Sequence, residues 1–98
     1  MANRLTVELS STQVIILEQN VPSPFAEQTT IQYFIPENIT NAQMIFTDML
    51  GNTIKTAEVK SGYGVVTVFA SNLTTGQYSY SHVIDGKVVE SKRMVKTK

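Results

Sequence analysis

The sequence contains no cysteine, only three prolines and a single histidine, His82. Without cysteine, the chain has no disulfide bond, no thiolate nucleophile and no Cys-ligated metal. Eight basic residues balance eight acidic ones, so no general positive charge favours nucleic acid as a partner. No apolar run approaches the roughly 18 residues that span a bilayer. The first residues, MANRLTVELSS, lack the apolar stretch of a signal peptide.

The residues that are present favour β-structure in one domain. Ninety-eight residues, 42% of them hydrophobic, suffice for a single core. Val, Ile and Thr make up about a third of the chain and favour strands. Period-2 alternation recurs, whereas no helical stripe of about ten residues does. The alternating segments are 5–9, 31–35, 42–47 and 78–84, with a weaker pattern at 54–59, and apolar runs lie at 14–17, 65–69, 88–89 and 94–95.

Turn-forming residues separate these segments. Asp85-Gly86 is typical of a two-residue hairpin turn. Glycines in DMLGN (48–52) and SGYG (61–64) predict two longer hairpins, because glycine tolerates a positive φ. Pro36 ends the strand that begins at Ile31, because proline cannot donate to a ladder. The unbroken apolar run 14–17 predicts a strand that is covered on both faces or lies at a sheet crossing.

These patterns predict an all-β fold, an immunoglobulin-like antiparallel β-sandwich of about seven strands. A closed barrel is the alternative. Leu73, Gly76 and Tyr78 favour the sandwich, because a tyrosine near the start of a late strand returns its hydroxyl to the upstream backbone in immunoglobulin-like domains. The other interpretation of Tyr78 is an ordinary core residue after a turn.

Catalytic chemistry is not indicated. Ser81, His82 and Asp85 are the residue types of a hydrolase triad, but neighbours on a strand point to opposite faces, so Ser81 cannot bond His82. His82 is therefore interpreted as a half-buried strand histidine. The acidic residues are scattered, and no catalytic residue, metal site or cofactor is predicted. Two matches to the glycan-acceptor pattern, 38–40 and 72–74, are interpreted as turn residues.

Four segments in order resemble the C-terminal sorting domain of type IX secretion cargo, the type A sorting family. They are LEQNVPSPF, DMLGN, LTTGQYSYSHVIDGK and SKRMVKTK. The family pattern has an N-x-P-N-P-F segment, a D-x-x-G hairpin, an L-x-x-G-x-Y strand and a closing basic strand. Ser23 departs from it, because asparagine is usual between the two prolines. The matching residues of this chain are Pro22, Pro24, Phe25, Asp48, Gly51, Leu73, Gly76, Tyr78, Lys92, Arg93, Met94 and Lys96.

The resemblance implies a non-enzymatic secretion signal in residues 14–98, with residues 1–13 a linker or an extra N-terminal strand. Such a domain is the C-terminal part of a larger cargo of a Gram-negative bacterium. It passes through the periplasm, engages the type IX outer-membrane translocon and its shuttle, and is removed by a sortase-like peptidase. The cargo is then secreted or attached to the cell surface. Neither a cofactor nor nucleic acid is implied.

Other functions remain open at this point. An immunoglobulin- or fibronectin-like structural or adhesion module of a bacterial surface protein would have the same fold. A phage-tail or fibre domain is a third hypothesis. In a sorting domain or in an adhesion module, exposed edge strands would allow a homodimer.

Two of the motifs carry structural expectations of their own. Pro22 and Pro24 restrict φ and cannot join a ladder, so LEQNVPSPF is predicted to cross between sheets with Phe25 anchored in the core. SKRMVKTK is predicted to be the last strand, with Met94 or Val95 inward and its lysines on the solvent face. Its basic side chains would steer docking to a receptor, with strand addition as one mode. They are Lys92, Arg93, Lys96 and Lys98.

Overall fold

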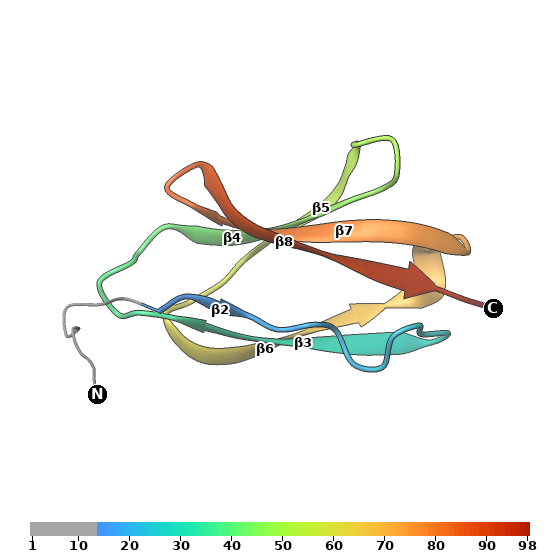
Figure 1. Cartoon of the computed structure of the whole chain (residues 1–98), viewed down its shortest axis with the longest axis horizontal. Helices are drawn as coiled ribbons and strands as arrows, with labels where there is room; N and C mark the ends of the chain where they lie inside the picture. The colour runs from blue at the N-terminus through green and yellow to red at the C-terminus, as the bar shows by residue number, and fades with distance from the viewer. Residues whose placement is uncertain (1–13) are drawn as a thin grey trace, which may run out of the picture.

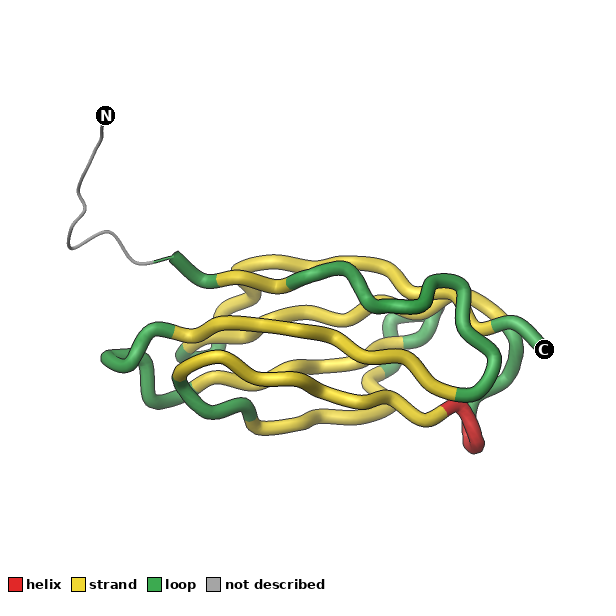
Figure 2. Tube along the Cα trace, turned by 90° about the horizontal axis from the view of Figure 1, so that it is seen from below, coloured by secondary structure: helices red, strands yellow, loops and turns green. Residues whose placement is uncertain are grey.

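The computed structural model describes residues 14–98. Its seven strands form two antiparallel sheets stacked face to face, which confirms the sandwich over the barrel (Figures 1 and 2). One sheet has the order β2-β3-β6, with bounds Ile16–Leu17, Gln28–Ile35 and Gly62–Phe69. The other has the order β5-β4-β7-β8, with bounds Thr53–Glu58, Ala42–Thr47, Gly76–Ile84 and Lys87–Lys96.

Period-2 alternation decides which side chains enter the core. In β4, the alternate residues Ala42, Met44 and Phe46 are buried. Tyr78, Tyr80 and His82 are buried along β7, as their spacing predicts. His82 is fully buried rather than half-buried, because it lies on the inner face of a central strand. The largest side chains that are almost completely buried are Tyr80, Phe25, Phe46, Ile31, Ile35, Met44 and Met94.

Two of the predicted hairpins form as expected. Asp85 and Gly86 join β7 to β8 with φ values of +51° and +82°, the left-handed conformation that a two-residue hairpin of this twist requires. The turn 48–52 joins β4 to β5, and Gly51 adopts a φ of +88°. Pro36 follows directly after the end of β3, also as expected. The only helix of the described residues, the 3-10 turn Ala70–Asn72, is far too short to cross a bilayer.

The prediction of a third hairpin at SGYG is wrong. The strands on either side of it belong to different sheets, because β5 pairs with β4 whereas β6 pairs with β3. Val59 is buried where the chain leaves β5, and its N–H donates to the carbonyl of Ala42. Gly62, with a φ of +92°, then begins β6 in the opposite sheet. Glycine marked the bend correctly but carries no information about the sheet that the next strand joins.

The first apolar run also differs from its prediction. Only Ile16 and Leu17 form a strand, and of the run 14–17 only Leu17 is buried. Val14 is 55% exposed. β2 is the two-residue edge strand of the smaller sheet, in which Ile16 is only half-buried and Leu17 alone faces the core. The predicted linker or extra strand at 1–13 lies outside the described residues.

The two long sides of the sandwich differ. On one side, residues 18–25 pass from β2 across to the edge of β8 (Figure 1). On the other side, β5 and β6 are the unpaired edges of their sheets within residues 14–98. A hollow of about 590 Å³ opens there, with Ile54 from β5, Phe69 from β6 and the core residue Phe46 in its lining. Among the described residues, the chain therefore closes the sandwich along one side and leaves the other side open.

Candidate functional site

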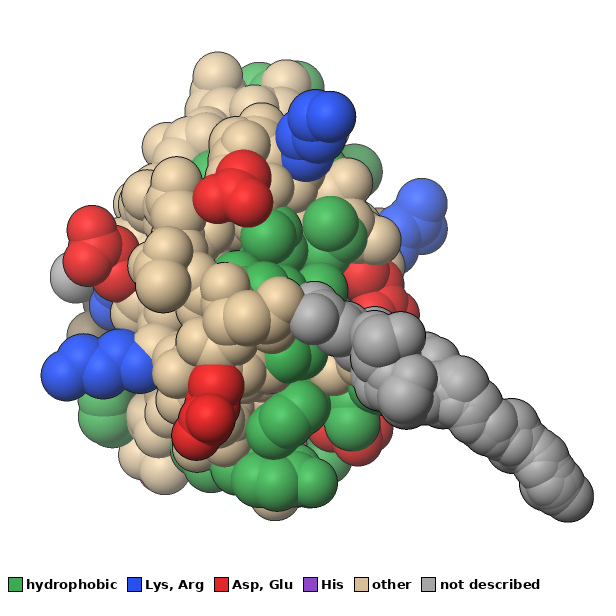
Figure 3. Space-filling model, turned by 90° about the vertical axis from the view of Figure 1, so that its left-hand side faces the viewer, with side chains coloured by type: hydrophobic (Ala, Val, Ile, Leu, Met, Phe, Trp, Pro, Cys, Tyr) green, Lys and Arg blue, Asp and Glu red, His purple; other side chains and the backbone are tan. Residues whose placement is uncertain are grey.

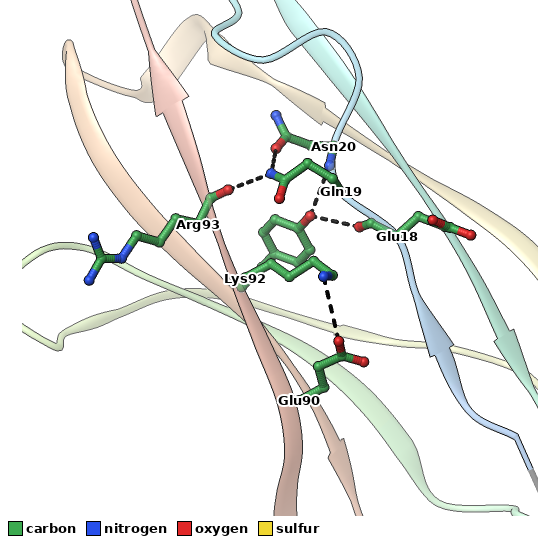
Figure 4. Close-up of polar contacts among 7 residues, drawn as sticks. Glu18, Gln19, Asn20, Glu90, Lys92 and Arg93 are labelled. Carbon is green, nitrogen blue, oxygen red and sulfur yellow. Dashed lines mark hydrogen bonds and ion pairs between the residues drawn. The ribbon is translucent and has the colours of Figure 1, made fainter.

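The segment LEQNVPSPF joins the two sheets through the hydroxyl of Tyr80. This hydroxyl donates to the Glu18 carbonyl at 2.7 Å and accepts from the Asn20 N–H at 2.9 Å (Figure 4). Burial raises the pKa of Tyr80 to about 12, aided by the nearby carboxylates of Glu90 and Glu18 and opposed by the bond from Asn20. The hydroxyl therefore keeps its proton and stays a donor at neutral pH. A side chain of the larger sheet thus holds the backbone that leaves the smaller one.

The buried amide of Asn20 shapes the chain before the prolines. Its Nδ2 donates to the Pro22 carbonyl at 3.1 Å and to the Thr29 hydroxyl at 3.0 Å. The Thr29 hydroxyl donates to the same Pro22 carbonyl at 2.8 Å. Both prolines, Pro22 and Pro24, follow cis peptide bonds and are exposed. The buried side chains of Asn20 and Thr29 thus have hydrogen-bond partners inside the protein, as buried polar groups require.

Phe25 ends the segment as a core residue. Its side chain is 1% exposed, as the anchor interpretation predicted. Its N–H donates to the Val95 carbonyl at 2.9 Å, and its carbonyl accepts from the Thr97 N–H at 2.7 Å. The Nε2 of Gln19 adds a bond to the Arg93 carbonyl at 2.6 Å. The segment therefore covers part of the edge of β8 with hydrogen bonds.

The DMLGN turn is shaped by Asp48. One carboxylate oxygen of Asp48 accepts from the N–H groups of Leu50 and Asn52, each at 2.9 Å. The N–H of Asn52 is the main cause that lowers the pKa of Asp48, and the Leu50 and Gly51 N–H groups contribute. Asp48 and Gly51 thus form the turn, while the two residues between them, Met49 and Leu50, point into solvent.

The Tyr78 corner forms as predicted. The hydroxyl of Tyr78 donates to the Thr74 carbonyl at 2.7 Å, which returns it to backbone just upstream. Leu73 is half-buried against the core, and Gly76 begins β7. These three residues pin the connection between the sheets. That role explains them without contact to a partner.

The basic strand differs from its prediction in one respect. Met94 is fully buried and Val95 is exposed, but Lys92 and Lys96 lie on the same face of β8 as Met94, because they are two residues away from it. Both lysines are half-exposed at the margin of the sandwich, and Lys92 pairs with Glu90 at 3.5 Å. Arg93 lies on the opposite face. The basic residues therefore do not share one solvent face.

The four motifs nevertheless converge on one end of the molecule. Phe25 bridges to Lys96, and Tyr78 pairs with Met94. Asp48 and Tyr78 line one depression of about 300 Å³ together with Arg93. The carboxyl-terminal residues and the 3-10 turn lie at this same end (Figure 2). We call it the C-terminal end of the sandwich, made of Phe25, 48–52, 70–76, Tyr78 and 92–98.

We call residues 18–25 the crossing segment. Its exposed part includes Pro22, Ser23 and Pro24. The opposite end of the sandwich shows a mixture of acidic, basic and hydrophobic side chains (Figure 3). Across residues 14–98, no three side chains of His, Asp or Glu gather closely enough to hold a metal ion.

Sequence reasoning missed two residues of this arrangement, Asn20 and Tyr80. Asn20 lies within LEQNVPSPF at the asparagine that begins the N-x-P pattern, so that motif already contained a signal for it. Nothing local in the sequence pairs Tyr80 with residues 62 positions earlier, because the contact exists only across the two stacked sheets.

The described residues thus form an all-β sandwich domain of two antiparallel sheets, whose four short motifs meet at one end. The chain belongs to the family of secretion system C-terminal sorting domains, whose family model matches residues 21–97. This confirms the resemblance to type IX sorting domains, a family of sorting signals rather than of enzymes. A search of curated proteins found no match.

Proposed function

We propose that this domain is the folded secretion signal of a larger cargo protein, which it directs across the outer membrane through the type IX system. Membership in the sorting-domain family supports this role. The convergence of the four motifs on the C-terminal end of the sandwich is the observation that carries the proposal further. A receptor can read residues that are distant in sequence only if the fold brings them together.

The C-terminal end of the sandwich is suited to recognition in the folded state. The segment that leads to Phe25 is held by a hydrogen bond that the Asn20 amide donates, and the 48–52 turn is held by bonds that the Asp48 carboxylate accepts. A pre-ordered surface loses little conformational entropy when it docks. Met49 and Leu50 provide exposed apolar contacts, and Arg93 and Lys98 provide exposed positive charge.

The partners in this proposal are the outer-membrane translocon and its shuttle, which meet the domain from the periplasm. A sortase-like peptidase then removes the domain, and the cargo is released or attached to the surface. Strand addition along β8 beyond Arg93 would first have to displace Phe25, since Phe25 already bonds Val95 and Thr97. We therefore infer that a receptor contacts side chains of this end rather than extending β8 there.

A reporter fusion tests the proposal. Residues 14–98 are joined to the C-terminus of a fluorescent protein that carries a signal peptide, in a host with a type IX system, and the secreted fraction is measured. The double variant Arg93→Glu, Lys98→Glu reverses two exposed charges at the C-terminal end of the sandwich. We expect its secretion to fall about tenfold, equal to about 1.4 kcal/mol of docking free energy.

A matched control reverses two exposed charges elsewhere. Lys60→Glu, Lys87→Glu makes the same change in net charge at the opposite end of the sandwich. We expect it to be secreted like the unaltered fusion. Equal loss in both variants would contradict recognition of the C-terminal end. Retention of the unaltered fusion inside the cell would overturn the sorting function and leave the adhesion module as the alternative.

We also infer that two copies of the domain can associate through an exposed edge strand. This association does not depend on secretion, and we infer that β6 is the edge strand through which it occurs.

A further inference from the structure

The edges of the two sheets are not equally protected against pairing. Natural proteins protect edge strands by short length, charge, proline, bulges or a covering segment. β2 has two residues, β5 carries Lys55 and Glu58, and β8 is covered at Val95 by Phe25. Within residues 14–98, β6 has none of these devices. Its eight residues, GYGVVTVF, contain neither charge nor proline, and its pairing with β3 has no bulge.

The outer face of β6 is apolar and exposed. Tyr63, Val65 and Phe69 are 85%, 59% and 63% exposed. The ring of Tyr63 packs on that of Phe34 in β3, with ring centroids 4.5 Å apart. β3 carries no charged residue either, so the outer face of these two strands is uncharged along its whole length. Exposed apolar surface beside an unprotected edge marks a site of association.

We propose that β6 pairs antiparallel with β6 of a second copy, so that the two three-stranded sheets become one six-stranded sheet. A two-fold axis gives the same surface to both subunits, which an antiparallel pair of identical strands satisfies. If the two-fold axis passes through the centre of the strand pair at Val66, the numbers of two directly opposed residues add up to 132. Tyr63 then lies opposite Phe69 of the partner subunit, and Val65 lies opposite Thr67 of the partner subunit.

This register uses what the strand exposes. Directly opposed aromatic and β-branched side chains are the pairs that stabilise antiparallel strands. Both aromatic residues of β6, Tyr63 and Phe69, are exposed and lie near opposite ends of the strand. A two-fold axis at its centre therefore forms two Tyr63–Phe69 pairs. An uncharged strand can form no ion pair with a charged partner segment, whereas two identical uncharged strands meet without charge repulsion. A second copy is therefore the occupant that the edge fits best.

Sedimentation equilibrium of the full chain tests the proposal. One strand pair buries less surface than a standard interface, so the association is weak and needs concentrations from about 10 µM to about 1 mM. We expect a monomer–dimer equilibrium in this range. Val65→Lys places a charge on the outer face beside the axis and should weaken the dimer at least about tenfold. Val88→Lys is the matched control, because Val88 is 64% exposed on β8, and should leave dimerisation unchanged.

The register is tested by a single cysteine. The chain has no cysteine of its own, and Val66→Cys would place two thiols opposite each other at the axis. Cα atoms of directly opposed strand residues lie at a separation that a disulfide can bridge. We expect rapid oxidation to a covalent dimer, and no comparable product from Val88→Cys.

Other results would overturn the proposal. A monomer at every concentration, or equal association of the Val65→Lys and Val88→Lys variants, would exclude pairing through β6. Concentration-independent protection of β6 amides from hydrogen exchange in a monomer would show that another segment of the same chain covers the edge. Because the purified chain is measured, the result does not depend on whether the domain directs secretion.

Discussion

Tyr80 connects the two sheets through a single oxygen atom. Tyr80→Phe would leave the Asn20 N–H and the Glu18 carbonyl without the partner they have now. We expect a loss of about 1–3 kcal/mol in the free energy of unfolding, measured by urea denaturation, because unpaired buried polar groups are costly. Tyr63→Phe is the control, since Tyr63 is 85% exposed, and should change stability by less than about 0.5 kcal/mol. Equal effects would contradict the linking role of the Tyr80 hydroxyl.

Phe25 tests whether the crossing segment is anchored by its side chain. Phe25→Ala would remove a ring that is 1% exposed, and we expect a loss of about 3–5 kcal/mol. Phe69→Ala removes the same ring from a site that is 63% exposed and should cost far less. Thermal unfolding of both variants measures the difference. If Phe25→Ala left the transition in place, the segment would be held by its backbone hydrogen bonds alone.

His82 is a buried titratable group without a polar partner. Its side chain is fully buried, and neither ring nitrogen has a hydrogen bond within the described structure. The Tyr33 ring approaches it edge-on, with ring centroids 5.9 Å apart. Burial lowers the pKa of His82 below its usual 6.5, and the nearby Glu90 carboxylate only partly opposes this shift. The folded state therefore favours neutral imidazole.

This gives a defined pH dependence of stability. Because the pKa of His82 is lower in the folded state, the unfolded chain binds more protons as the pH falls below about 6.5. Stability is then fully present above this pH and decreases below it. We expect a loss of at most about 1 kcal/mol between pH 7 and pH 5.5, the limit set by protonation of the unfolded chain, measured by urea denaturation. The His82→Leu variant should lose little over that range, and an equal slope in both proteins would exclude His82 as the cause.

At the scale of elements, the crossing segment and the last strand stabilise each other. Phe25 binds the backbone at Val95 and Thr97, while Met94 fills the core beside it. The basic residues of SKRMVKTK therefore belong to a strand that the fold cannot lose. A loss of secretion after truncation would not by itself identify a recognition site.

Removal of residues 94–98 should unfold the domain. It deletes the fully buried Met94 and both backbone partners of Phe25. We expect circular dichroism to show no cooperative thermal transition, since the losses together approach a typical 5–15 kcal/mol stability. Removal of Lys98 alone should leave the transition unchanged, because its side chain is exposed. A cooperative transition in the shorter chain would reopen the basic strand as a separable docking element.

Individual strands were predictable where local patterns are strong. Alternation identified the buried residues of β4 and β7, and Asp85-Gly86 identified the hairpin between β7 and β8. The partner of β6 was not predictable, because a glycine bend permits both a hairpin and a crossing to the other sheet. The faces of Lys92 and Lys96 followed from the burial of Met94, which left no freedom for residues two positions away.

At the scale of the whole molecule, the two sheets should unfold together. They share one core and are joined by Tyr80, Phe25 and the Tyr78 corner. We expect urea transitions followed by circular dichroism and by tyrosine fluorescence to coincide, as a two-state domain of this size requires. Separate midpoints would mean that one sheet is stable without the other.

The sequence alone determined the fold class, the family and the residues of the four motifs. Strand propensity, period-2 alternation and turn chemistry are local properties, and they are visible wherever the chain is read. Order and spacing of the motifs were enough to indicate type IX sorting, which the family match bears out.

Only the tertiary structure decided where those motifs lie. It brought Phe25 to Lys96 and Asp48 to Tyr78 at one end, buried Met94 beneath the basic strand, and left β6 as an unprotected edge. It also supplied Tyr80 as the link between Glu18 and the larger sheet. These are contacts between segments far apart in the chain, and they depend on which strands share a sheet rather than on any local preference.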